Sequence, residues 1–91
     1  MTGQVAIIVK IMPESLETDL NEIKQKARIS LEKEGAQNLS IEEQPIAFGL
    51  KALMLKFAWP EQKDTDLIEN ILSEIKGVSS AKIEDYRRAF G

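Results

Sequence analysis

Two stretches of the chain are apolar on both faces, as is typical of strands in the middle of a sheet. Residues 5–12 (VAIIVKIM) form a β-branched run that Pro13 closes. Residues 50–59 (LKALMLKFAW) form a second run, which stops at Pro60. A strand buried on both faces has no need to alternate apolar and polar residues. The pattern therefore predicts two central strands.

Two further stretches are more polar and predict edge strands. Residues 38–46 mix apolar positions with glutamates, and Pro45 among them has no N–H to donate to a neighbouring strand. Residues 78–86 alternate only weakly and are polar. The turn-like residues 47–49 leave room for a hairpin between the second and third strands.

Apolar residues at helical spacing predict two amphipathic helices. Asp19 and Glu22 are placed as a capping box for the first helix, and Gly35 is placed to end it. The second helix is expected to start at Asp64 or Thr65. The predicted buried residues are Leu16, Leu20, Ile23, Ala27 and Leu31 in the first helix and Leu67, Ile68, Ile71, Leu72 and Ile75 in the second.

The element order predicts an α+β fold, the ferredoxin-like βαββαβ sandwich, with a four-stranded antiparallel sheet and two helices on one face. In this plan the first and third strands are central, and these are the most apolar strands here. With 91 residues the chain has room for one such domain, expected to span residues 1–91.

The composition excludes most of the residue types on which small enzymes run covalent chemistry. There is no cysteine and no histidine, which removes disulfides, thiolate nucleophiles, imidazole bases and the usual zinc ligand sets. The acidic pairs Glu42 with Glu43 and Asp64 with Asp66 read as solvated charges, and no glycine-rich phosphate cradle is present. We expect no enzyme activity, no cofactor and no bound metal.

Charge and hydropathy bear on partners and location. The formal net charge of −3 argues against general nucleic-acid binding, so no direct nucleic-acid contact is expected. Phe57 and Trp59 share a strand face and could stack on RNA bases, but core packing explains them as well. No leader-like start and no apolar run of the roughly 20 residues that a membrane span needs is visible, so we expect a cytoplasmic protein without membrane contact.

Two features are not explained by folding alone. Phe48 is a large aromatic within a predicted turn, where it could anchor a partner or fold back to cap the core. The closing residues 85–91 (DYRRAFG) carry Arg87 and Arg88, which could serve a partner or form a solvated charged tail. The topology places these features at opposite ends of the sheet, roughly 25 Å apart for strands of this length.

The sequence resembles the archaeal elongation factor 1-beta family and the exchange domain of its eukaryotic relatives. The resemblance covers essentially the whole chain. It rests on VKIMPES at residues 9–15, EEQPIAFGLKAL at 42–53, IKGVSS at 75–80 and the Tyr-Arg-Arg sequence at 86–88.

The resemblance implies a guanine-nucleotide exchange factor that binds elongation factor 1-alpha, a GTPase, and speeds release of its GDP. It implies that the hairpin aromatic, here Phe48 with the neighbouring Gly49 and Lys51, contacts one domain of the partner. It also implies that a basic residue near the C-terminus reaches the partner's magnesium and phosphate site. The eukaryotic pattern has a lysine there. Counting from Tyr86 places Arg88 at that position, and whether Arg87 or Arg88 fills the role stays open.

A second interpretation remains, in which the chain is a regulatory domain that binds a small ligand and acts as a dimer. The predicted open face of the sheet is less polar than exposure to water requires, which is compatible with dimerisation or with partner contact. The oligomeric state is not decided. The residues expected on this face are Ala6, Ile8, Lys10, Ala52, Met54 and Lys56.

Overall fold

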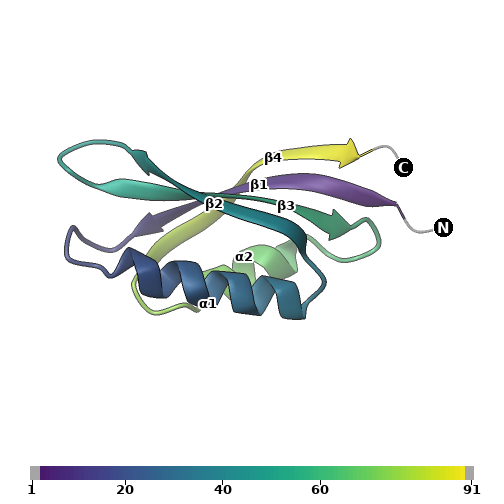
Figure 1. Ribbon diagram of the computed structural model, residues 1–91, viewed down its shortest axis with the longest axis horizontal. Helices are drawn as coiled ribbons and strands as arrows, with labels where there is room; N and C mark the ends of the chain where they lie inside the picture. The colour runs from purple at the N-terminus through teal and green to yellow at the C-terminus, as the bar shows by residue number, and fades with distance from the viewer. Residues whose placement is uncertain (1–2, 90–91) are drawn as a thin grey trace.

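The computed structural model describes residues 3–89 and confirms the predicted α+β ferredoxin-like fold. Two helices lie side by side beneath one face of a four-stranded sheet (Figure 1). The elements are β1 (Gln4–Pro13), α1 (Leu20–Lys33), β2 (Gln37–Pro45), β3 (Lys51–Pro60), α2 (Asp66–Ser73) and β4 (Val78–Ala89).

The sheet order is β2-β3-β1-β4, so the two most apolar strands are central, as predicted. All three strand pairs are antiparallel, with Val9 of β1 opposite Leu55 of β3 on one side and Ile83 of β4 on the other. Because side chains alternate between faces, this register places one set of residues toward the helices and the other on the open face.

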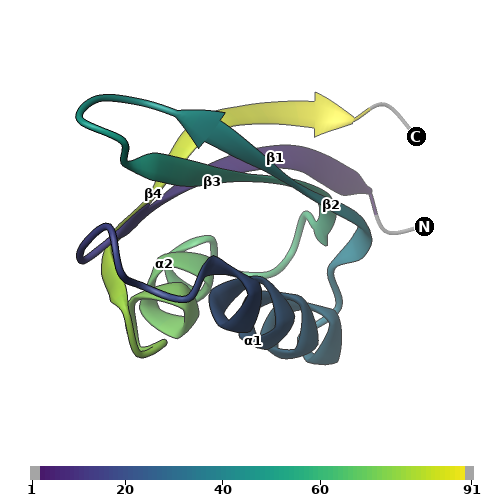
Figure 2. The same cartoon turned by 60° about the vertical axis from the view of Figure 1, so that its left-hand side comes forward.

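The core lies between the sheet and the helices, which Figure 2 shows from the side. Asp19 caps α1 by accepting a hydrogen bond from the backbone N–H of Glu22 at 3.2 Å, and Gly35 follows the helix with a φ of +111°. Phe57 and Trp59 are buried and pack edge to face, with their ring centroids 6.0 Å apart. Both rings face the helices, so neither is available on the open face to stack on RNA bases.

Three expectations about the elements were wrong. Ile75 was predicted within the second helix, but α2 ends at Ser73 and Ile75, although buried, follows it. Leu16 was predicted on the buried side of the first helix, but it precedes α1 and is 65% exposed, because the Asp19 cap starts the helix at Leu20. The last strand was predicted to end near Tyr86. It continues to Ala89, because Arg87 and Arg88 pair with Ala6 and Val5 of β1.

The predicted solvated tail is therefore part of the sheet up to residue 89. Residues 90 and 91 of that predicted tail lie outside the described residues. Backbone pairing to a central strand holds the two arginines in an extended conformation, in which successive side chains point to opposite faces.

Candidate partner-binding site

The turn between β2 and β3 holds Phe48 in a conformation that few residues other than glycine adopt. The Leu50 N–H donates to the Ala47 carbonyl at 2.9 Å, which closes a turn with Phe48 and Gly49 at its centre. Both central residues have positive φ, +55° and +81°. Positive φ at both positions is the hallmark of the type I′ hairpin turn, in which Asn-Gly is preferred. An aromatic occupies the position that normally favours asparagine.

The Phe48 side chain is 94% exposed. This excludes the alternative in which the ring folds back to cap the core. Ile46, on the same turn, is 37% exposed. A large apolar side chain held in solvent on a strained backbone is a feature that packing does not explain.

Lys51, at the start of β3, belongs to a small charge network below this turn. Its Nζ lies 3.6 Å from one carboxylate oxygen of Glu43, whose other oxygen accepts a hydrogen bond from Lys24 of α1 at 2.6 Å. Lys24, and to a lesser extent Lys51, hold the pKa of the Glu43 carboxyl below its ordinary value of 4.5. Lys51 is thus paired within the chain, and its charge is partly neutralised.

At the other end of the sheet, Arg87 and Arg88 point to opposite faces. Arg87 lies opposite Ala6 on the open face, and its Nε donates to Asp85 at 2.9 Å. Arg88 lies opposite the buried Val5 on the helix side, where its Nε is 3.1 Å from Glu61. The two side chains are 80% and 78% exposed. The two arginine side chains therefore belong to different faces of the sheet.

Tyr86 shares the face of Arg88, because it lies two residues away on the same strand, and it is 50% exposed. Val5 of β1 lies opposite Trp59 of β3 on one side and opposite Arg88 of β4 on the other, so Trp59 and Arg88 are at the same height in the sheet. Lys51 lies eight residues from Trp59 along β3. At about 3.3 Å per residue, the two ends are about 26 Å apart. The structure therefore separates the sequence-predicted residues into two groups, Phe48 with Gly49 and Lys51 at one end and the tyrosine and arginines at the other.

The open face of the sheet is mixed in character. Ala6 and Lys56 are exposed, whereas Ala52 is buried by its neighbours. Lys10 of β1 lies directly opposite Lys82 of β4, and neither has an ion-pair partner among the described residues. Such a face differs from the predominantly apolar surface that a stable homodimer usually buries.

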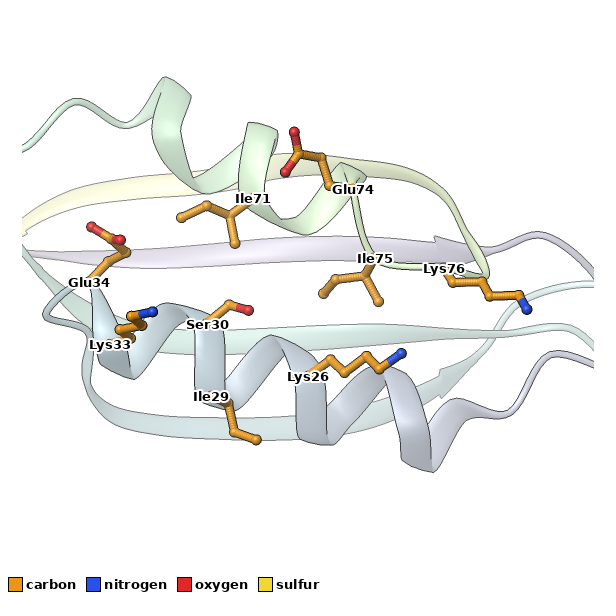
Figure 3. Close-up of a pocket in the computed structure, with 9 residues that line it drawn as sticks. All are labelled: Lys26, Ile29, Ser30, Lys33, Glu34, Ile71, Glu74, Ile75 and Lys76. Atoms are coloured by element: carbon orange, nitrogen blue, oxygen red, sulfur yellow. The ribbon is translucent and has the colours of Figure 1, made fainter.

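A groove of about 580 Å³ runs between the helices on the side away from the sheet (Figure 3). Ile71 of α2 and Ile75, which follows that helix, point into it, while lysines and glutamates border it, among them Lys26 and Glu74. Its size is that of a small-molecule site, but it lies within one chain, whereas the ligand-binding interpretation places the ligand between two paired domains. No cluster of three potential metal ligands and no helix long and apolar enough to span a membrane occurs within residues 3–89.

Comparison with known families bears on the choice between an exchange factor and a ligand-binding regulatory domain. The model of the EF-1 guanine nucleotide exchange domain matches residues 6–89, which includes both the turn and the arginine strand. The chain belongs to this family. The match confirms the resemblance that the hairpin and strand motifs indicated.

Individual members of the exchange-domain family match over nearly their full length. Elongation factor 1-beta of Desulfurococcus amylolyticus is 41% identical over 88 residues, covering 94% of this chain and 97% of the relative. Elongation factor 1-beta of Staphylothermus marinus is 38% identical, with the same coverage. That of Methanosarcina acetivorans is 40% identical over 87 residues, covering 93% and 98%. These names support a role for the chain as a nucleotide exchange factor in translation.

Sequence reasoning on this exchange domain missed Leu16 as a surface residue. Its spacing from Leu20 and Ile23 matched a helix face, and only the Asp19 cap, which starts the helix at Leu20, four residues after Leu16, could have revealed the error. Sequence reasoning also could not choose between Arg87 and Arg88. Their consecutive positions would have indicated opposite faces if the last strand had been extended to include them.

Proposed function

We propose that this chain promotes the exchange of GDP for GTP on elongation factor 1-alpha during translation elongation. It does so by binding the GTPase at two places, without covalent chemistry and without a cofactor of its own. The observation that carries the proposal is the 94% exposed Phe48 on a strained turn, at the end of the sheet opposite the arginines.

Phe48 is the docking anchor in this proposal. Aromatic side chains dominate the energetics of many interfaces because they bury a large area with few rotatable bonds. The ring is already held out in solvent, so binding requires no rearrangement of the turn. Gly49 allows the turn to form, and Lys51 lies at its base.

Arg88 is the cation presented to the magnesium and phosphate site of the GTPase. It shares a face with Tyr86, and in its ion pair with Glu61 the arginine side chain remains 78% exposed. Exposed ion pairs contribute about 0–1 kcal/mol, so exchanging Glu61 for a partner costs little. A cation near bound Mg²⁺ repels the metal and competes for its oxygen ligands, which weakens phosphate binding.

Exchange follows from differential affinity. A factor shifts the GTPase toward the nucleotide-free state only if it binds that state more tightly than the GDP-bound state. By reciprocity, incoming nucleotide then weakens binding of the factor. Docking through Phe48 supplies affinity, and the cation at the distant end supplies the difference between the two states.

The test is the release of fluorescent GDP from elongation factor 1-alpha of the same organism, as a function of the concentration of this chain. Phe48→Ala is expected to raise the half-saturating concentration about 30-fold, equivalent to a hot-spot loss of about 2 kcal/mol. Arg88→Ala is expected to lower the maximal rate with a smaller effect on half-saturation.

Arg87→Ala is the matched control, since it removes an equally exposed arginine from the opposite face of the same strand. It should leave both parameters near the wild-type values. If Arg87→Ala and Arg88→Ala lower the maximal rate equally, the assignment of the cation is wrong. If the wild type does not accelerate GDP release at any concentration, the exchange proposal itself fails.

A further inference from the structure

Leu16 lies in an ordered loop beside the Phe48 turn. The loop joins β1 to α1, and Ser15 and Thr18 brace it. The Ser15 N–H donates to the Thr18 hydroxyl at 3.1 Å, and the Thr18 N–H donates to the Ser15 carbonyl at 3.3 Å. These bonds hold the loop closed while the Leu16 side chain remains 65% exposed. An ordered backbone thus presents a large aliphatic side chain to solvent.

The β1–α1 loop touches the β2–β3 turn. A β-carbon added to Gly49 would lie 3.3 Å from Cδ2 of Leu16, which places the leucine against the backbone of the turn. Figures 1 and 2 show both loops at the same end of the molecule, away from the two chain termini. A recess of about 260 Å³ lies between them, with Pro13, Leu16 and Leu50 among its lining residues.

Exposed apolar side chains gather at this end. The described residues include five exposed large hydrophobic side chains, and three of them, Leu16, Ile46 and Phe48, lie on these two loops. Single exposed hydrophobic residues are normal on protein surfaces, whereas a group of them marks an interaction site. Glu14 and Glu17, both exposed, flank Leu16 and supply a polar rim.

We propose that Leu16 is a second apolar contact for the partner that docks at Phe48. The docking surface then consists of both loops, with the recess between them taking a side chain from the same domain of the GTPase. This inference rests on the proposed exchange function and adds a contact to it. The recess is smaller than the roughly 300–1,000 Å³ typical of small-molecule pockets, which favours a protruding partner side chain over a free ligand.

The chemistry of the surface defines the complementary partner surface. An aliphatic or aromatic side chain opposite Leu16 would be desolvated in the recess, and basic side chains around it would face Glu14 and Glu17. This is the common arrangement of an apolar interface centre with a polar rim. The opposite charges at the rim would mainly raise the rate of association, and added salt would reduce that effect.

The experiment compares Leu16→Ala with Ile29→Ala in the full chain. Ile29 is an equally suitable aliphatic residue, 66% exposed but on α1 and away from both loops. The half-saturating concentration in the GDP-release assay is expected to rise at least fivefold for Leu16→Ala, with the maximal rate unchanged. Ile29→Ala should stay within twofold of the wild type. Both variants should keep the wild-type urea midpoint, because each removes a mainly exposed side chain.

The double variant Leu16→Ala/Phe48→Ala tests whether the residues share one surface. The combined loss should be smaller than the product of the single losses, because removing either side chain loosens the contact made by the other. A Leu16→Ala variant that stays within twofold of the wild type, while Phe48→Ala loses docking, would overturn this inference and leave the exchange function intact.

Failure of the exchange function itself gives a different result. If the wild type does not accelerate GDP release, the same variants are compared by calorimetric titration with elongation factor 1-alpha. If Leu16→Ala weakens binding and Ile29→Ala does not, the two-loop surface is still supported. Absence of binding by the wild type would overturn both proposals.

Discussion

Replacing Phe48 with asparagine should make the protein more stable and at the same time remove its docking anchor. Phe48 has a φ of +55° and is followed by Gly49 at +81°, the backbone pattern for which Asn-Gly is preferred. A left-handed conformation costs most L-residues about 1–2 kcal/mol, and asparagine bears less of this cost than phenylalanine.

The ring itself contributes little to folding. It is 94% exposed, so its burial accounts for about 0.1–0.2 kcal/mol of the 1.5–3 kcal/mol that a fully buried phenylalanine provides. Removing the strain should therefore dominate. We expect Phe48→Asn to gain about 1 kcal/mol, which is about 4–8 °C in Tm for a domain of this size.

Phe48→Ala separates backbone strain from side-chain contact. Alanine removes the ring but, like phenylalanine, is strained at positive φ, so its stability should match that of the wild type. Urea or thermal unfolding followed by the fluorescence of Trp59, the single tryptophan and fully buried, reports both variants. In the exchange assay both variants should lose docking equally.

The reasoning is refuted if Phe48→Asn is no more stable than Phe48→Ala. That result would mean that the turn stores no strain at this position and that the aromatic does not compromise folding. A stabilised Phe48→Asn variant with unchanged exchange would instead show that the ring is not the anchor.

Three further substitutions test the structural reasoning elsewhere. Gly77→Ala should cost at least about 1 kcal/mol, because Gly77 has a φ of +96° and an added β-carbon would lie 2.9 Å from Cγ2 of Thr18; an unchanged urea midpoint would contradict this. Leu72→Ala, at a fully buried position, should lower the free energy of unfolding by about 2–5 kcal/mol, measured by circular dichroism. A smaller loss would indicate that the core collapses around the site. Glu43→Gln should lower stability near neutral pH, because Lys24 holds the pKa of the folded carboxyl below 4.5. The lowered pKa stabilises the fold above pH 4.5, and this stabilisation disappears as the pH falls through the folded-state pKa. The urea midpoints of the wild type and Glu43→Gln should therefore converge in acid. An equal difference between them at all pH values would contradict the assignment.

Much of the fold follows from local patterns. The apolar runs at residues 5–12 and 50–59 indicated which strands are central, since a strand with a neighbour on each edge does not need the charged residues that protect an exposed edge. The Asp19 cap and Gly35 indicated the limits of the first helix, because capping depends on hydrogen bonds and backbone angles within a few residues. Phe48 drew attention for a local reason as well, as an aromatic within a turn.

The sequence by itself determined the order of the elements, the identity of most core residues and the presence of an unusual aromatic turn, because each depends on side chains close together along the chain. Only the tertiary structure decided what lies next to that turn and which way the terminal arginines face. Leu16 is 33 residues from Gly49 in the sequence, and their contact exists only because β1 and β3 pair so that the two loops meet at one end. Arg87 and Arg88 are separated by the pleat of β4, whose pairing with β1 no pattern within the last residues specified.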